Sequence, residues 1–511
     1  MAGADDPERA IVAAVSSGAA LGTREPARMI ETHAARVFLT ANRAYKLKRP
    51  VCLAYLDFST PEKRRAALEE ELRLNRRTAP DLYLDVAPVT RGADGAIKLS
   101  GDGETVDWAL IMKRFPDGAL LSERLAAGKL ARTDIEKLAE AVARFHAEAE
   151  KRTDAGGVAA MRAVAALDTR ELEAFAGRGL DAQAVAVLNA SRAALMEEAA
   201  PLLDERMRAG FVRRCHGDLH LGNVFDDAGT PTPFDCIEFD ERLATIDVLY
   251  DLAFLLMDLA ERGRVDFANA AMNRYLVACP RGEWEANARA LALLPLFLAE
   301  RAAIRAHVAA RAGRCGDAAR YLAWAVRAAK RPEPRLVAVG GLSGTGKSVL
   351  ARSLAPDFCV HAGALHLRTD VLRKRLAGVG ATDRLPPEAY TREAGARVYE
   401  TMFTLARAGL DGGHPVVLDA VFARPDERAE AERIARAAGV RFDGLWLEAR
   451  RAVLIERVAR RKGDPSDADA AVVERQMRYD LGPITWRRVD ATPEPGKVAT
   501  EARAVLKLAS D

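Results

Sequence analysis

The sequence predicts a multidomain protein in which a bilobal α+β domain precedes an α/β domain with a parallel sheet. Three observations support this prediction. Strand and turn patterns dominate residues 30–115, amphipathic helical spacing dominates residues 118–210 and 245–330, and short apolar runs alternate with helical segments after residue 335. With 511 residues, of which 49% are hydrophobic, the chain is long enough for two or three separately cored units.

The main domain boundary is expected at residues 330–335, Lys-Arg-Pro-Glu-Pro-Arg. Here two prolines and several charges separate a helical stretch from the apolar run Leu336–Val339. The predicted domains are a helical lead-in at 1–29, a bilobal domain at 30–330 with a small lobe at about 30–115 and a large lobe at about 116–330, and an α/β domain at 336–511.

Composition limits the classes of partner. The chain has 76 basic and 73 acidic residues, so it has no general field that would attract nucleic acid or a membrane surface. The N-terminus carries Asp and Glu instead of a basic leader, and no apolar run approaches the ~18 residues of a membrane span. We expect a cytoplasmic protein without a membrane partner, and the charge balance disfavours nucleic acid as a partner. Its six cysteines are widely spaced, which favours reduced thiols.

Residues 215–223 read CHGDLHLGN and contain H-x-D-x-x-x-x-N, the spacing of a kinase catalytic loop. In such a loop the aspartate meets the acceptor hydroxyl and the asparagine holds metal, which assigns these roles to Asp218 and Asn223. Asp235 follows twelve residues later, after a short apolar approach, in a position suited to Mg²⁺ on nucleotide phosphates. A capped polar turn is the alternative, but the aspartates that follow at 247 and 251 disfavour it.

An alternating segment at residues 37–48 is typical of a β-hairpin and places Lys46 and Lys48 on one face of its second strand. Either lysine is a candidate to bind nucleotide phosphates. Its carboxylate partner is expected from the helix that follows. The candidates are Glu69, Glu70 and Glu71. Glu71 is preferred for its spacing to the next apolar residues, and no G-x-G-x-x-G loop precedes the hairpin.

The segments HGDLHLGN, FDCIEFD and IDVLYDLAFL together resemble the aminoglycoside phosphotransferase and choline kinase superfamily, over about residues 30–330. The resemblance implies the fold of eukaryotic protein kinases. It implies Asp218 as catalytic base, Asn223 and Asp235 as metal ligands, and His216 and Asp251 as supports of the loop. Glu238 and Asp240 are candidates for substrate or metal contact, or else solvated loop acids. The resemblance does not identify an acceptor.

Residues 341–348 read GLSGTGKS, a complete G-x-x-x-x-G-K-[ST] between an apolar strand and a helical segment. The glycines let backbone N–H groups face phosphates, Lys347 reaches the terminal phosphates, and Ser348 ligates Mg²⁺ at the helix N-terminus. The expected nucleotide-binding residues are Gly341, Ser343, Gly344, Thr345, Gly346, Lys347 and Ser348.

Three further positions complete this second pattern. Asp370 and Arg373 lie three residues apart on one helix face, where Asp370 can deprotonate an acceptor hydroxyl and Arg373 can hold an anionic group. Asp419 ends the apolar strand at 416–418 and is a candidate metal-associated acid, with a helix cap as the alternative.

Arg457 and Arg461 begin a segment that continues to residue 469 and looks like an arginine-bearing lid. Both are candidates to close on the transferring phosphoryl group, and a solvated basic helix face is the alternative. GLSGTGKS, RTDVLR, VVLDAVF and this segment resemble small P-loop kinases of the polynucleotide kinase, zeta toxin and gluconate kinase kind, over about residues 335–490.

The sequence therefore predicts a tandem ATP-dependent phosphotransferase. It would use ATP and Mg²⁺ at two separate sites and move the γ-phosphoryl group to hydroxyls of small molecules. Two alternatives stay open. One module is a regulatory binding domain, or the C-terminal module phosphorylates the 5′ ends of nucleic acids.

Overall fold

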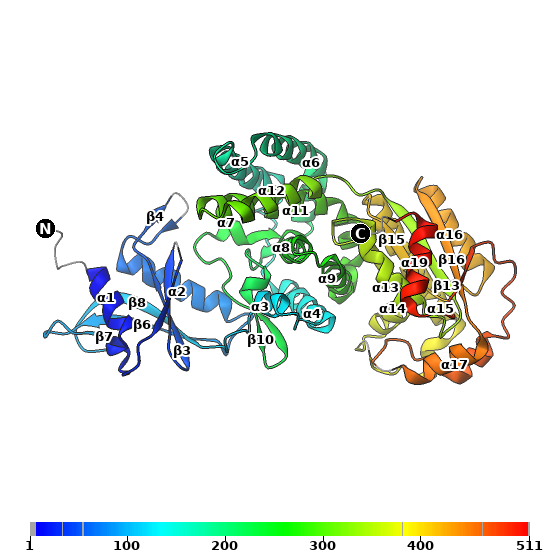
Figure 1. Ribbon diagram of the computed structural model, residues 1–511, viewed down its shortest axis with the longest axis horizontal. Coiled ribbons are helices and arrows are strands. Elements are labelled where there is room, and N and C mark those ends of the chain that lie inside the picture. The colour runs from blue at the N-terminus through cyan, green and yellow to red at the C-terminus, as the bar shows by residue number, and fades with distance from the viewer. Residues whose placement is uncertain (1–6, 33, 54–55, 381, 462, 509–511) are drawn as a thin grey trace. The chain divides into compact units, whose positions relative to one another are not determined.

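The computed structural model describes residues 7–32, 34–53, 56–380, 382–461 and 463–508 (Figure 1). The chain divides into two compact units. The first comprises Met1–Ala141, Glu148–Gly156 and Met207–Asp251, and the second comprises Val142–Ala147, Gly157–Arg206 and Leu252–Asp511.

The first unit contains a six-stranded antiparallel sheet with the order β1-β2-β3-β8-β6-β7. Its strands are β1 (Arg28–Glu31), β2 (Ala35–Leu39), β3 (Arg43–Lys48), β6 (Tyr83–Arg91), β7 (Ile97–Leu99) and β8 (Glu104–Lys113). Two short strands, β4 (Cys52–Leu53) and β5 (Leu56–Asp57), form a separate hairpin.

Helices pack on both faces of this sheet. Helix α1 (Pro7–Ser16), followed by η1 (Ala19–Leu21), shares a core with Leu47, whereas α2 (Pro61–Asn75) shares a core with Ala44. Side chains alternate along a strand, so Lys46 and Lys48 lie with Ala44 on the α2 face of β3. The expected hairpin at residues 37–48 is formed by β2 and β3.

Short elements of the first unit surround the catalytic-loop motif. Strand β9 (Val212–Arg214) pairs with β12 (Thr245–Asp247), and β10 (Val224–Asp227) pairs with β11 (Thr230–Pro233). The helical elements here are α3 (Leu121–Ala126), η2 (Leu221–Asn223) and α7 (Glu241–Ala244). The pairing of β9 with β12 joins the two ends of the segment 215–244, which carries the candidate acids, and the β10–β11 hairpin lies within that segment.

Helices make up the rest of the kinase-like region, as the apolar spacing predicted. Those of the second unit are α5 (Gly157–Phe175), α9 (Val265–Ala278), η3 (Arg281–Glu283), α10 (Trp284–Arg289), η4 (Ala290–Leu293), α11 (Leu294–Arg311) and α12 (Cys315–Ala328). Helices α4 (Arg132–Glu148), α6 (Ala182–Arg208) and α8 (Val248–Glu261) contribute residues to both units.

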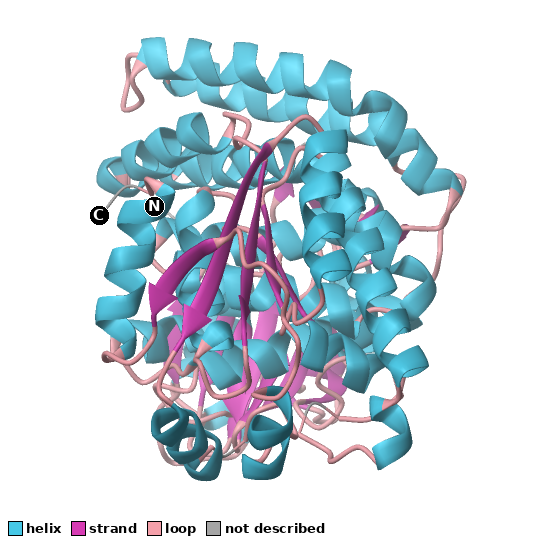
Figure 2. Ribbon diagram, turned by 90° about the vertical axis from the view of Figure 1, so that its right-hand side faces the viewer, coloured by secondary structure: helices cyan, strands magenta, loops and turns pink. Residues whose placement is uncertain are grey.

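The second unit also contains a five-stranded parallel sheet with the order β14-β15-β13-β16-β17 (Figure 2). Its strands are β13 (Arg335–Gly341), β14 (Leu365–Arg368), β15 (Val416–Asp419), β16 (Arg441–Glu448) and β17 (Arg487–Asp490). The expected apolar runs form β13, β15 and β16. The predicted α/β architecture with a parallel sheet is confirmed.

Helices cover both faces of the parallel sheet. Helices α13 (Lys347–Leu354) and α19 (Pro495–Leu506) share one core with it, and α15 (Arg392–Asp411) and α16 (Pro425–Ala437) contact the strands from outside that core. The remaining elements are η5 (Ala355–Phe358), α14 (Thr369–Leu376), η6 (Pro387–Tyr390), α17 (Arg451–Arg460) and α18 (Ala470–Gln476). The ends of β13, β14 and β15 meet at one edge of the sheet, where ligand sites of such sheets form.

None of the helices in the described part of the chain combines the length and the apolar character that crossing a bilayer requires.

Candidate functional site

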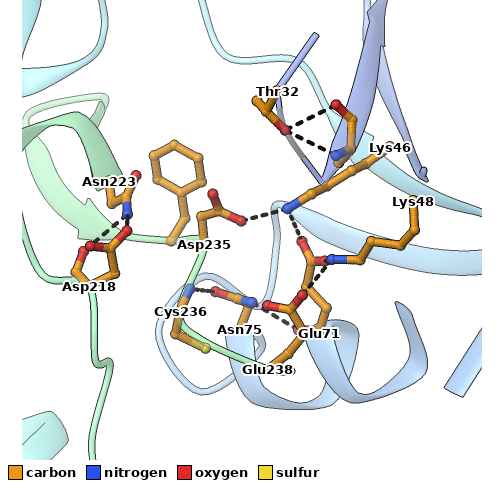
Figure 3. A network of polar contacts seen from close by, with 12 residues as sticks. Thr32, Lys46, Lys48, Glu71, Asn75, Asp218, Asn223, Asp235, Cys236 and Glu238 are labelled. Carbon is orange, nitrogen blue, oxygen red and sulfur yellow. Dashed lines mark hydrogen bonds and ion pairs between the residues drawn. The ribbon is translucent and has the colours of Figure 1, made fainter. Parts of the chain in front are cut away.

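A cluster of five charged side chains lies on the α2 face of β3 (Figure 3). The Lys46 ammonium contacts Glu71 Oε1 at 2.7 Å and Asp235 Oδ1 at 2.6 Å. The Lys48 ammonium contacts Glu71 Oε2 at 2.6 Å and also pairs with Glu238. The two candidate lysines therefore share one carboxylate, and each binds a second acid from the segment that follows the catalytic loop.

Charge pairing determines the protonation of this cluster. Burial acts to lower the pKa of Lys46, but the charges of Asp235 and Glu71 outweigh it and hold that pKa well above its usual range. Burial acts to raise the pKa of Asp235, and Lys46 overcomes it, so that this pKa is lowered. Both groups are charged near neutral pH.

Helical phase separates the three candidate glutamates of α2. Glu69 pairs with Arg65 at 2.8 Å and Glu70 pairs with Arg73 at 2.6 Å on the solvent side of the helix. Glu71 is completely buried and faces the lysines. One residue corresponds to about 100° of rotation on a helix, so neighbouring glutamates point in different directions.

Asp218 and Asn223 are in direct contact. The Asn223 amide donates to Asp218 Oδ2 at 2.9 Å and to the Asp218 carbonyl at 3.0 Å. The Asp251 carboxylate accepts the backbone N–H groups of His216 and Gly217 at 3.1 and 2.8 Å. The loop is thus anchored from its buried side, while the Asp218 side chain keeps 37% of its surface exposed.

Asp235 has a backbone conformation that non-glycine residues rarely adopt, with φ of 61°. Such a conformation costs about 1–3 kcal/mol and is maintained where surrounding contacts fix it. Here the Tyr83 hydroxyl accepts the Asp235 N–H at 3.0 Å, and Asn75 Oδ1 accepts the Cys236 N–H at 2.9 Å. Figure 3 shows the Asp235 carboxylate between the Asp218–Asn223 pair and Lys46. Oxygen ligands of this kind suit Mg²⁺.

Glu238 and Asp240 have different surroundings. Glu238 is held by Lys48 inside the charged cluster, and burial raises its pKa although the charge of Lys48 opposes this. Asp240 is the N-cap of α7, where its side chain accepts the Arg242 N–H at 3.0 Å.

The second candidate site begins at the loop of residues 341–348, which was predicted to bind phosphate. Gly344 and Gly346 have φ of 86° and 88°, and a Cβ at Gly344 would lie 2.6 Å from the Leu454 carbonyl oxygen. Any side chain would strain this turn. The Lys347 ammonium donates to the Leu342 carbonyl at 3.0 Å. The loop is also braced by Ser343 N–H, which donates to Gln476 at 2.8 Å, and by the Thr345 hydroxyl, which donates to the Leu342 carbonyl at 2.8 Å.

The electrostatics of Lys347 differ from those of Lys46. Burial lowers the pKa of Lys347 to about 8, although the charges of Asp419 and Asp370 act in the opposite direction. Ser348 follows directly in the first turn of α13.

Charged residues converge at the ends of β14 and β15. Asp419 Oδ2 lies 3.4 Å from His366 Nε2 and 3.7 Å from Arg368 Nε. The Arg368 guanidinium also contacts Asp464 at 2.6 Å and Asp370 at 3.5 Å. Burial acts to raise the pKa of Asp419, but His366, Arg368 and Lys347 overcome it and hold the pKa at about 2.

Several buried polar atoms of these residues and of the neighbouring arginines make no hydrogen bond within the described part of the chain, although His366, Arg368 and Asp419 lie within ion-pair distance of one another. They are His366 Nε2, Arg368 Nε, Arg373 Nε, Asp419 Oδ2 and Arg461 Nη1. Buried polar groups are normally hydrogen-bonded, so an unsatisfied group of this kind calls for an explanation. Phosphate oxygens and a hard cation would supply the missing partners. The donor set therefore fits a metal-bound nucleotide.

The predicted arginines lie in three different surroundings. Arg373 donates to the Ala389 carbonyl at 2.7 Å, and Arg461 lies 4.0 Å from Asp464. Arg457 donates to three successive backbone carbonyls at residues 491–493. Arg457 and Arg461 both line a pocket of about 340 Å³ beside the phosphate-binding loop. Lys462, which follows Arg461 in the lid segment, lies outside the described residues.

Comparison with known proteins identifies both regions. The model of the phosphotransferase enzyme family matches residues 33–293. The chain belongs to this phosphotransferase family. An AAA domain model matches residues 336–480 of the phosphotransferase. Together the two matches make the chain an ATP-dependent kinase that combines a kinase-like domain with a P-loop domain.

Relatives and solved structures are similar to all or part of this phosphotransferase. Uncharacterized proteins of Mycobacterium tuberculosis and Mycobacterium bovis are each 30% identical over 469 residues, which cover 88% of this chain and 90% of theirs. The GDP complex of aminoglycoside 2′-phosphotransferase-IIIa is 13% identical, covering 62% of this chain and 98% of its own, with a TM-score of 0.39. A gluconokinase from Sinorhizobium meliloti 1021 is 19% identical over 35% of this chain and 94% of its own, with a TM-score of 0.26.

Several residues of the phosphotransferase sites were not identified from the sequence. Tyr83 and Asn75 bind the backbone of Asp235 and Cys236 from distant elements, His366 and Arg368 lie beside Asp419, and Asp464 contacts Arg368. Arg368 could have been predicted from the sequence, because it is a charged residue at the end of an apolar run and directly precedes Thr369 and Asp370.

Proposed function

We propose that this phosphotransferase is a tandem kinase, with one ATP site in residues 30–330 and another in residues 336–511. Each site would move the γ-phosphoryl group of ATP to a hydroxyl of a small molecule. The observation that supports the proposal is that each region brings together its own lysine and its own aspartates. The two sets share no residue.

In the first site, Asp218 would accept the proton of the acceptor hydroxyl. The hydroxyl oxygen then forms a bond to the γ-phosphorus, while the bond from that phosphorus to the bridging oxygen breaks and ADP leaves. Lys46, oriented by Glu71, would position the phosphates. Asn223 and Asp235 would hold Mg²⁺, which when bound neutralises phosphate charge.

In the second site, Lys347 and the backbone N–H groups of residues 341–348 would bind the phosphates. Asp370 would accept the proton of the acceptor, and Arg373 would hold an anionic group of that acceptor. Ser348 and Asp419 would hold Mg²⁺. Arg461, which lines the pocket, would offset phosphoryl charge, whereas Arg457 would shape the wall of that pocket through its carbonyl contacts.

The test measures ATP consumption and identifies phosphorylated products by mass. The unsubstituted chain, Asp218→Asn and Lys347→Ala are compared across sugars, amino alcohols, aminoglycosides, nucleosides and a 5′-hydroxyl oligonucleotide. We expect each substitution to remove a different product, with a loss of at least about 100-fold. Asp227→Asn and Lys497→Ala, both at exposed positions, are the matched controls.

The alternative outcomes are equally informative. If one substitution leaves every product unchanged, the region that carries it is a binding or regulatory domain and the tandem reading is wrong. If Lys347→Ala removes a salt-sensitive phosphorylation of the oligonucleotide, the acceptor of the second site is a nucleic-acid end.

A further inference from the structure

Two asparagines of α9 bind the backbone in front of and within β14. Asn269 Nδ2 donates to the carbonyl oxygens of Ala362 and Ala364 at 2.7 and 2.9 Å. Asn273 Nδ2 donates to the Ala364 carbonyl at 3.2 Å, and Asn273 Oδ1 accepts the His366 N–H at 2.7 Å. Both asparagines lie in the second compact unit, four residues apart on one helix face.

These contacts take the place of a neighbouring strand. Strand β14 is at the edge of the parallel sheet, and its Leu365 N–H donates inward to the Pro415 carbonyl at 2.9 Å. Backbone groups alternate along a strand, so the Ala364 carbonyl and the His366 N–H point to the open edge. Unpaired groups there are costly when buried. Asn273 pairs with both of them.

The approach between the α9 region and the sheet is close at other points. A Cβ at Gly363, where φ is 70°, would lie 2.9 Å from Asn269 Nδ2, and a Cβ at Gly412 would lie 2.5 Å from the Arg289 carbonyl oxygen. His361 Nε2 lies 2.6 Å from the Ala328 carbonyl oxygen. Close contacts with the segments before β14 and before β15 therefore extend from α9 to the ends of α10 and α12.

The edge strand leads directly into the second site. Two residues after Ala364, His366 lies 3.4 Å from Asp419, and Arg368 follows at 3.7 Å from the same carboxylate. A slip of one residue in β14 would turn both side chains to the other face of the sheet. The backbone register of residues 362–366 therefore decides whether these groups reach Asp419.

We propose that Asn269 and Asn273 are positioning residues of the P-loop site. By pairing with the backbone of residues 362–366 they fix the register of β14, and thereby hold His366 and Arg368 against Asp419. A helix of the kinase-like region is thus part of the framework of the second site. The inference rests on the proposed function of that site.

The test uses the full-length chain with Asp218→Asn as background, so that the remaining turnover reports the second site. Asn273→Ala is the main variant and Asn269→Ala the second, and Val277→Ala, half-buried on the same helix, is the matched control. Hydrogen exchange of residues 364–370 reports the register of β14. The kcat and the KM for Mg·ATP report the chemistry.

We expect faster exchange at residues 364–370 in both asparagine variants, unchanged exchange at residues 336–341, and unchanged behaviour of Val277→Ala. We expect kcat to fall at least about tenfold, because small displacements of catalytic groups are costly, with KM for Mg·ATP changed less than about twofold. Faster exchange with normal kcat would mean that the asparagines only stabilise the edge strand and do not position the site, which would overturn the proposal. Unchanged exchange would overturn it as well.

Failure of the proposed function has a different signature. If the background chain shows no turnover that Lys347→Ala removes, the second site is not a kinase and the inference fails with it. A general loss of helical circular dichroism in both variants would also count against a positioning role, since the effect would then be global.

Discussion

The affinity of the second site for ATP should depend on pH through Lys347. Its ammonium group lies inside the phosphate-binding loop, where burial lowers the pKa to about 8 from an ordinary value of 10.5, against the charges of Asp419 and Asp370. The lysine is mostly charged at pH 7, and about one tenth of the molecules carry the charge at pH 9. Phosphate binding favours the charged form, so it must be coupled to proton uptake.

The size of the effect follows from linkage. If bound phosphates return the pKa of Lys347 to at least its ordinary value, the Kd for Mg·ATP rises about tenfold between pH 7 and pH 9. Uptake is about half a proton per ATP at pH 8. The first site should contribute little proton uptake between pH 7 and pH 9, because Asp235 and Glu71 hold the pKa of Lys46 well above its usual range despite its burial.

Titration calorimetry of Mg·ATP in two buffers with different ionisation enthalpies measures this uptake directly. Asp235→Asn as background weakens the first site, and Lys347→Arg is the matched control, because arginine keeps its charge throughout this pH range. An affinity that stays constant from pH 7 to pH 9 would refute the reasoning. So would equal proton uptake by the chains with Lys347 and with Lys347→Arg.

Lys347 should also change how the free energy of unfolding depends on pH, and in the opposite direction to a lysine that is paired with a carboxylate. Between about pH 8 and 10.5, the buried Lys347 of the folded chain binds fewer protons than the same lysine in the unfolded chain. Without ligand, the free energy of unfolding should therefore increase as the pH rises through this window.

Three other outcomes are expected. Glu238→Gln should destabilise the first unit by about 1–3 kcal/mol in denaturant unfolding, because it leaves the buried Lys48 with one carboxylate instead of two. Lys48→Met in the same chain should recover most of this loss. Gly444→Ala should lower stability by about 1–3 kcal/mol in thermal unfolding, because its Cβ would lie 2.4 Å from the Trp486 ring, whereas Gly496→Ala, with no atom within 4 Å, should not. Chelation of Mg²⁺ should abolish both products without lowering the melting temperature of the ligand-free chain.

The parts of the fold that follow from local patterns could be predicted from the sequence. Strands β13 and β15 are buried along almost their whole length, and β16 is buried at residues 445–447, so these stretches appear as apolar runs, and the helices around them show the helical period. The hairpin of β2 and β3 shows the period of a strand. These signals lie within one element and need no knowledge of its neighbours.

The candidate site residues divide in the same way. Asp218, Asn223 and Lys347 lie in motifs with fixed spacing, and the helical phase of α2 favoured Glu71. The choice between Lys46 and Lys48 had no local answer, because both lie on one face of β3 and the structure pairs both with Glu71.

Long-range contacts left no such signal. Tyr83 binds the backbone of Asp235, a residue 152 positions away, and Asn273 binds His366 across 93 positions. Each is a single polar residue within an otherwise ordinary element, and no spacing rule connects it to its partner. Two asparagines four residues apart in an apolar helix are the one trace that the α9 contact leaves in the sequence.

Because Lys46 and Lys347 have different environments, the two proposed sites should respond differently to pH. The charges of Asp235 and Glu71 hold the pKa of Lys46 well above its usual range despite burial, so Lys46 stays charged between pH 7 and pH 9. Lys347 contacts a backbone carbonyl and releases its proton near pH 8. For a tandem kinase it follows that pH alone distinguishes the two activities. The KM for ATP of a product that requires Asp218 should stay constant between pH 7 and pH 9, and that of a product that requires Lys347 should rise about tenfold.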